Sequence, residues 1–188
     1  TEVKDRPELD RWILSRLQVL KQTVRNSFND YEPTRAGRAI SEFVDEELSN
    51  WYVRLCRRRF WKGEMSTDKR MAYETLYECL YTISQLMSPI APFFADWLYQ
   101  NLTEHLPEGN KEKSVHLSYL AEAKTALIDE HLNDRMEMAQ QLSSMVFSLR
   151  KKENIKVRQP LHKMMVPALK PETVELIESI QGIVLSEV

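Results

Sequence analysis

The stretch SNWYVRLCRRRFWK, residues 49–62, predicts a helix with two unlike faces, around which the rest of the chain is organised. At about 100° per residue, an α-helix separates the side chains of this region into an apolar and a polar set. The apolar stripe would hold Val44, Leu48, Trp51, Tyr52, Leu55 and Cys56. The opposite side would hold Asn50, Arg54, Arg57, Arg58 and Trp61. The segment therefore has a packing face and a cationic face.

The cationic face has no acidic residue one helical turn earlier to neutralise it. Asn50 precedes Arg54 by four residues, and Arg54 itself precedes Arg58. Like charges this close together destabilise the helix unless a bound anion neutralises them. Guanidinium groups beside an indole suit phosphates and unstacked bases together. The face is thus a candidate nucleic-acid contact.

A solvated face remains an open alternative, because the negative end of the helix dipole favours basic residues in the last turn. Gly63 is the expected C-cap of this helix. Arg59 differs from its neighbours, since it falls on the apolar stripe. We expect it to reach a carboxylate or a carbonyl at the end of the bundle and to be structural.

The composition favours long helices, and the net charge of the whole chain does not attract a polyanion. The chain has 188 residues, only four glycines and 43% hydrophobic residues, which suits one helical domain with a little left over. Its formal charge is −2, so any polyanion site must be local.

The reactive residue types show no catalytic or metal-ligand spacing. The two cysteines lie far apart in apolar helical patterns, which predicts buried free thiols, and the four histidines are scattered. We therefore expect no catalytic residue, metal or cofactor in this chain. Prolines and Asp96 break the longest apolar runs and the first residues resemble no signal peptide, which predicts a cytoplasmic protein without a membrane span.

Periodicity predicts five helices in the first four-fifths of the chain. A first helix is expected over about 8–28, and a long second helix follows the turn at 29–33 and ends in the basic stretch. A third begins at Ser66 or Thr67 and is interrupted at 88–92, a fourth runs to about Leu102, and 114–117 reads as a short extended piece. The fifth, 127–152, would turn inward Ile128, Leu132, Met136, Ala139, Leu142, Met145, Val146 and Leu149.

Beyond residue 152 the period changes to that of strands. Ile155 and Val157 alternate with Lys156 and Arg158, a short helix is expected over about 171–181, and 182–185 begins another strand. We predict two domains: a helical bundle over 1–152 and the start of a small α/β unit over 153–188. An unfinished strand-helix-strand unit and a missing initiator Met lead us to expect a fragment of a longer protein.

A second basic cluster lies at this junction, where residues 150–163 carry six cationic side chains against one acid. Lys151 and Lys152 fall at a helix end, where the dipole accounts for part of the charge. Lys156 and Arg158 would share one face of an extended segment. They could protect a sheet edge or give the same polyanion a second contact.

With both clusters in view, the chain resembles the anticodon-binding region of isoleucyl-tRNA synthetases, which are class I enzymes. The run from Ser49 to Arg59 is similar to the second bundle helix of that family, and Ser88 to Phe94 to its proline-broken helix junction. Ser114 to Leu117 resembles its short connecting strand, and Asn154 to Leu161 its exit from the bundle. The resemblance covers essentially the whole chain. It implies a mainly α fold, a five-helix bundle with a small truncated α/β appendage.

The resemblance also implies roles and partners. The partners would be the anticodon stem-loop of isoleucine tRNA and the catalytic domain of the same polypeptide, with neither DNA nor a membrane. Isoleucine activation, with ATP and Mg²⁺, would belong to parts of the parent enzyme that this chain does not match. RNA-binding residues would be Asn50, Arg54, Arg57, Arg58, Trp61, Lys151, Lys152, Lys156 and Arg158. A valyl- or leucyl-type relative, or a helical module whose basic faces dock other domains, remain alternatives.

Overall fold

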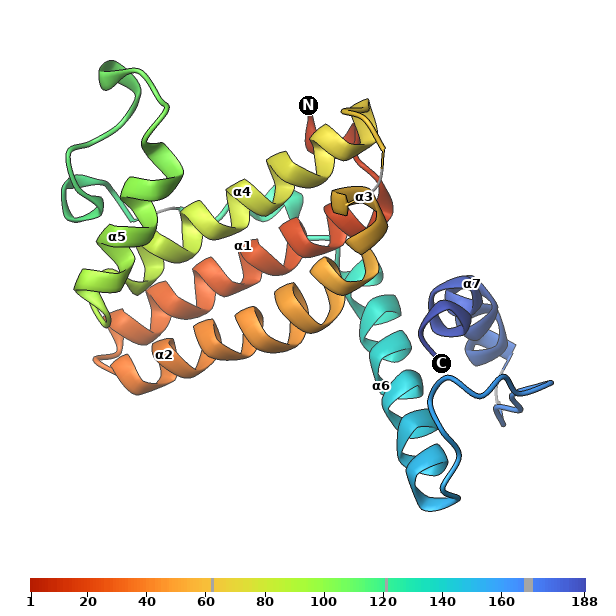
Figure 1. Cartoon of the computed structure of the whole chain (residues 1–188). Helices are drawn as coiled ribbons and strands as arrows, with labels where there is room; N and C mark the ends of the chain where they lie inside the picture. Colours follow the sequence, from red (N-terminus) through yellow and green to blue (C-terminus); the bar gives the residue numbers. More distant parts are fainter. Residues whose placement is uncertain (62, 121, 168–170) are drawn as a thin grey trace. The chain divides into compact units, whose positions relative to one another are not determined.

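The computed structural model describes residues 1–61, 63–120, 122–167 and 171–188, and shows a mainly helical protein (Figure 1). Lys62, the last residue of the basic stretch, lies outside them. The chain divides into two compact units, 1–128 and 129–188, and each is described by itself. The domain boundary that we predicted at residue 152 stays a prediction.

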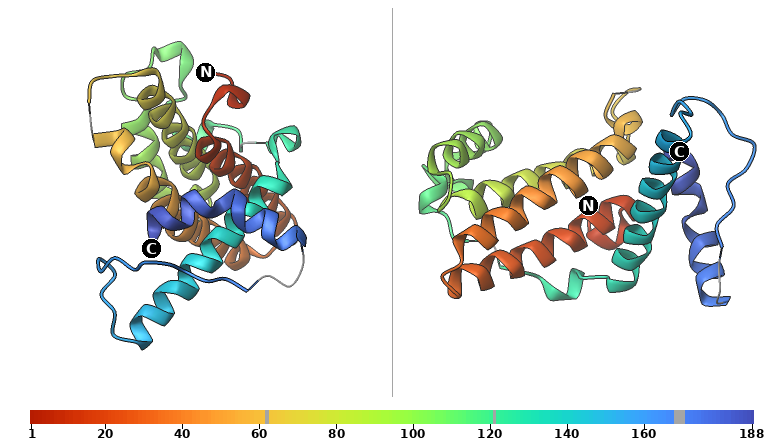
Figure 2. Two further views of the ribbon diagram at one scale, coloured as in Figure 1. Left: turned by 90° about the vertical axis from the view of Figure 1, so that its right-hand side faces the viewer. Right: turned by 90° about the horizontal axis from the view of Figure 1, so that it is seen from below.

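The first unit is built on three long helical stretches that run side by side (Figures 1 and 2). Helix α1 spans Glu8–Asn29, helix α2 begins at Pro33, and helix α4 spans Thr67–Met87. Ser66, one of the two residues at which we expected this helix to begin, caps α4 by accepting a hydrogen bond from the Lys69 amide. Between the three stretches lies a core that includes Trp12, Ile13, Leu17, Val24, Ile40, Tyr52, Cys56, Cys79 and Leu86.

We predicted one continuous α-helix for the second helical stretch, and this prediction is wrong. Helix α2 covers Pro33–Glu42, a π-helical segment η2 covers Phe43–Val53, and a short helix α3 covers Arg57–Trp61 after a turn at Cys56. The π-helical hydrogen bond spans one residue more than the α-helical bond, so the segment changes the phase of the side chains that follow. The predicted apolar face is nevertheless present, because Leu48, Trp51, Tyr52 and Cys56 are buried.

Helix α5, Pro92–Thr103, packs against α4 after the proline-containing turn at 88–91. The predicted extended piece at 114–117 is wrong. Residues Val115–Leu117 form a 3-10 turn, η4, and the Ser114 hydroxyl accepts from the His116 amide at its start. Asp96 on α5 accepts hydrogen bonds from the Ser114 hydroxyl and the Val115 amide, which favours this compact turn over an extended chain. Short 3-10 turns also occur at Val3–Asp5 (η1), Glu108–Asn110 (η3) and Thr125–Leu127 (η5).

The second unit consists of helices α6, Glu130–Lys152, and α7, Pro171–Glu187, which pack against each other. The strand-helix-strand prediction is wrong, since the described residues contain no strand. Ile180 and Val184, four residues apart, are both buried, so the run 182–185 continues the helical spacing of α7. Gly182 is exposed, and its helical cost of about 1 kcal/mol is small beside that burial.

The predicted inward face of α6 is correct for its first half only. Leu132, Met136, Ala139 and Leu142 are buried, whereas Met145 and Leu149 are exposed. None of the helices in the described ranges combines the length and apolarity that crossing a membrane requires.

Candidate nucleic-acid interface

Arg59 is held inside the first unit by two carboxylates. Its guanidinium donates to both oxygens of Asp10, at 2.6 and 2.9 Å, and to Asp68, at 2.9 Å to the carboxylate and 3.1 Å to the carbonyl. The prediction that Arg59 reaches a carboxylate or a carbonyl is therefore confirmed. Burial alone would lower the pKa of the Arg59 guanidinium, but the hydrogen bonds to Asp10 and Asp68 outweigh it and raise this pKa.

Asp10 is the centre of this network and is fully buried. The Tyr52 hydroxyl lies 2.9 Å from the Asp10 carboxylate, and burial together with the Asp10 charge raises the pKa of Tyr52. Cys56 lies beside the Arg59 guanidinium, and burial raises the pKa of its thiol to about 11. The network joins α1, η2, α3 and α4 at one end of the unit, and we call Asp10, Tyr52, Arg59 and Asp68 the Arg59 anchor.

The Arg59 anchor leaves the neighbouring arginines on the outside. Arg57 and Arg58 are exposed, and neither has a hydrogen-bond or ion-pair partner among the described side chains. Arg54 and Asn50 are exposed on the same stretch, and Trp61 keeps 79% of its surface accessible. We call these five residues the first basic face: Asn50, Arg54, Arg57, Arg58 and Trp61. All the residues that we assigned to the outer side of this helix are exposed, and their role in RNA binding stays a prediction.

The second basic cluster surrounds the C-terminus of α6. Asn154, with a φ of 54°, ends the helix in the left-handed region. The Ile155 amide donates to the Arg150 carbonyl at 2.8 Å and the Asn154 amide to the Lys151 carbonyl at 3.3 Å, which is a Schellman cap. Lys151 and Lys152 are exposed on the last turn.

Residues after this cap form turns rather than the predicted extended segment. The Gln159 amide donates to the Lys156 carbonyl at 2.9 Å, which closes a turn that carries exposed Lys156 and Arg158. An isolated strand has no partner for its backbone groups, and the described residues offer none here. The four predicted cationic residues still lie within one short segment, 151–158, and we call Lys151, Lys152, Lys156 and Arg158 the second basic face.

Arg150 organises this segment from inside. Its guanidinium is buried and donates to the carbonyls of Lys156, Gln159 and Val188 at 2.9–3.0 Å. Its Nε is buried without a partner among the described atoms. From the sequence we took Arg150 only as one of the six cations of this segment. Its place on the α6 stripe, three residues after Phe147 and four after Val146, was the one available signal that it points inward.

Asp10 was missed in the same way. It precedes Ile13 by three residues and Leu17 by seven, so it falls on the apolar face of α1. A carboxylate on such a face needs a buried cation. That spacing could have named Asp10 as the partner of Arg59.

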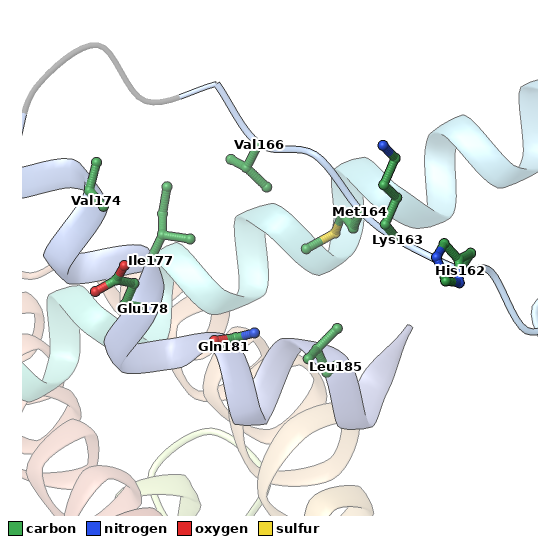
Figure 3. Close-up of a pocket in the computed structure, with 9 residues that line it drawn as sticks. All are labelled: His162, Lys163, Met164, Val166, Val174, Ile177, Glu178, Gln181 and Leu185. Carbon is green, nitrogen blue, oxygen red and sulfur yellow. The ribbon is translucent and has the colours of Figure 1, made fainter.

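Within the second unit a cleft of about 510 Å³ separates the segment 162–166 from α7 (Figure 3). Apolar Met164, Val166 and Leu185 line it together with Lys163 and Glu178. It contains none of the predicted site residues. Among the described residues, no group of three His, Cys, Asp or Glu side chains is placed to hold a metal ion.

Comparisons with known proteins identify the family of this chain. Residues 10–165 match the family described as the anticodon-binding domain of tRNA ligase. The chain is 55% identical to an isoleucine–tRNA ligase of Porphyromonas gingivalis over 97% of its residues, and 50% identical to one of Bacteroides thetaiotaomicron over 98%. A Thermus thermophilus isoleucine–tRNA ligase is 44% identical over 87% of the chain. In each case the match covers 16% of the relative.

Proposed function

The chain belongs to the family of anticodon-binding domains of tRNA ligases, and from that premise we propose that it binds the anticodon stem-loop of isoleucine tRNA. The isoleucine specificity is supported by relatives that are named isoleucine–tRNA ligases and match nearly the whole chain. Because the chain spans 16% of those relatives, ligation itself, with ATP and Mg²⁺, belongs to our proposal for the intact protein.

The observation that carries the proposal is the contrast within three consecutive arginines. Arg59 forms ion pairs with Asp10 and Asp68. Arg57 and Arg58 are exposed, like Trp61, and have no acidic partner among the described residues. Outward guanidinium groups can pair phosphates, and an exposed indole can stack on a splayed base. Asn50 can bond a base edge or a ribose. The second basic face would steady the RNA backbone.

In the intact ligase this contact would be remote from the reacting ends. Binding energy from the anticodon loop can be used to orient the acceptor end of the tRNA toward the catalytic site. The proposed role of this chain is therefore positioning, and none of its residues takes part in the chemistry.

The test is binding of isoleucine tRNA and a non-cognate tRNA to the chain across a salt series. If about five phosphates are paired, the slope of log K against log salt should be about −3.5 to −4.5. We expect the cognate tRNA to bind at least about threefold more tightly, since unstacked loop bases carry sequence information.

The control for this titration is the double substitution Arg35→Ala and Arg38→Ala, which removes two exposed arginines of α2 outside the proposed site. Affinity and slope should change little in this variant. Equal losses from the control and from Arg57→Ala with Arg58→Ala would reduce the interaction to general electrostatics. Absence of saturable binding by this chain, together with unchanged tRNA binding by the intact ligase when both arginines are replaced, would refute the assignment.

A further inference from the structure

Helix α5 carries apolar side chains on two opposite faces. On the inner face Ala95 and Tyr99 are buried, and the Tyr99 ring lies 5.5 Å from that of Tyr81. On the outer face Phe93 is 91% exposed and Trp97 is 59% exposed. A helix that is apolar all round is typical of a position with neighbours on every side. The first unit covers only one side of α5.

The outer side chains form one patch. The rings of Phe94 and Trp97 pack with centroids 5.6 Å apart, and Phe93 precedes Trp97 by one helical turn. Exposed Ile90 precedes Phe93 by three residues across the proline turn, and a Cβ on Gly37 of α2 would lie 3.7 Å from Ile90 Cδ1. We call Ile90, Phe93, Phe94 and Trp97 the aromatic patch. Contiguous apolar surface of this kind marks an interaction site.

The patch carries no charge. From Cys79 to Ala95 the sequence has no Asp, Glu, Lys or Arg. The next charged residue, Asp96, is turned to its own unit, where its carboxylate accepts from the Ser114 hydroxyl at 2.7 Å and the Val115 amide at 2.9 Å. A nucleic-acid surface needs cations for phosphates, and the two basic faces have them. The aromatic patch instead matches the apolar centre of a protein–protein interface.

The size of the relatives indicates what covers it. The chain matches the isoleucine–tRNA ligases along nearly its whole length but accounts for 16% of them. We propose that the aromatic patch docks an apolar surface supplied by the remainder of the same polypeptide in the intact ligase. This inference rests on the proposed function, because it takes the chain to be part of such an enzyme.

The test is hydroxyl-radical footprinting of this chain alone and of the intact ligase that contains it, each with and without isoleucine tRNA. Phe93 and Trp97 should oxidise at least about fivefold more slowly in the intact ligase before tRNA is added, since the centre of an interface is fully buried. Trp61, which is 79% exposed in this chain, is the matched control. Its oxidation should fall only when tRNA is added.

Three results would overturn the inference. Equal oxidation of Phe93 and Trp97 in the chain and the ligase would mean that nothing covers the patch. Protection in the isolated chain that rises with its concentration would assign the patch to a second copy. Protection only with tRNA would assign it to RNA. Failure of the proposed function has a different signature, in which tRNA leaves Trp61 unprotected.

A pair of variants makes the same separation independently. In the intact ligase, Phe93→Ser with Trp97→Ser should accelerate amide exchange along α5, and the same change in the isolated chain should leave its tRNA affinity within about twofold, because surface substitutions away from a site have small effects. Trp61→Ser should give the reverse pattern, with unchanged exchange in α5 and weaker tRNA binding. Unchanged exchange in the first variant would contradict docking.

Discussion

The two basic regions of this protein share a plan and differ in how their inner arginine is paired. In each, one arginine turns inward and fixes the backbone, and its neighbours remain outside. Arg59 is paired with the buried carboxylate of Asp10 and with Asp68, whereas the described acceptors of Arg150 are the backbone oxygens of Lys156, Gln159 and Val188. The inner arginine of the first region is therefore neutralised by side-chain carboxylates, whereas that of the second is held by backbone oxygens.

This difference determines what depends on each arginine. Asp10 cannot reach water if Arg59 is removed, because it is fully buried. Two of the three backbone oxygens that Arg150 holds belong to an exposed turn, 156–159, and can be hydrated if Arg150 is removed. We infer that the Arg59 anchor supports the stability of the first unit, and that Arg150 mainly sets the conformation of the second basic face.

The largest effect should follow from Arg59→Leu. Loss of the guanidinium leaves Asp10 as an uncompensated buried charge, so the free energy of unfolding should fall by about 3–5 kcal/mol. Urea unfolding of the first unit measures this loss. Arg58→Leu is the matched control and should change the free energy by less than about 0.5 kcal/mol. Similar losses of unfolding free energy in the two variants would contradict the distinction between inner and outer arginines.

Arg150→Leu should have a smaller effect, of about 2 kcal/mol, on the stability of the second unit. The variant removes charged donors from carbonyls that solvent can partly satisfy. Amide exchange should quicken at Ile155 and Gln159, whose amide hydrogen bonds define the cap and the turn. A loss as large as that from Arg59→Leu would show that the two anchors are energetically alike.

Removing the outer cations should weaken RNA binding with little change in stability. We expect Arg57→Ala with Arg58→Ala to reduce affinity for isoleucine tRNA about tenfold, which is about 1.4 kcal/mol, and to reduce the salt slope by about 1.4 in magnitude. Lys151→Gln with Lys152→Gln should reduce affinity about threefold, since an ammonium pairs a phosphate without the bidentate geometry of a guanidinium. The reverse order would make the second basic face the main RNA contact.

The smallest effect concerns the cap that precedes the second basic face. Asn154→Ala should cost about 1 kcal/mol, because an alanine at a φ of 54° is strained. Asn154→Gly should be neutral or slightly stabilising, since glycine adopts this conformation freely. Thermal unfolding of both variants, with Glu153→Ala as a control at the preceding position, tests the Schellman cap. Equal stability of the Ala and Gly variants would contradict it.

Sequence periodicity was a good guide wherever one local pattern sufficed. The first helix, the Ser66 cap and the fourth helix lie close to where the spacing of apolar residues placed them. The outward position of Arg57, Arg58 and Trp61 also followed from their angular place on one helix. These features depend on residues within a few turns of each other, which is the range over which helical geometry acts.

Periodicity failed where the outcome depended on a distant partner. The run 182–185 has strand-forming residues, but α6 offers a helical packing surface and the described chain offers no strand to pair with. Met145 and Leu149 continue an apolar stripe, yet both are exposed in this unit. Propensity yields to tertiary packing in each case.

The sequence by itself determined that the protein is mainly helical and which residues of its basic stretch face outward, because these properties are set by spacing along one chain segment. Only the tertiary structure decided which arginines pair with groups inside the protein. Arg59 meets Asp10 across 49 residues of sequence, and Arg150 meets the turn that follows its own helix. Such pairings depend on how the helices and turns approach each other in space. The sequence alone does not show whether a charged residue pairs with a buried carboxylate, a carbonyl or an RNA phosphate.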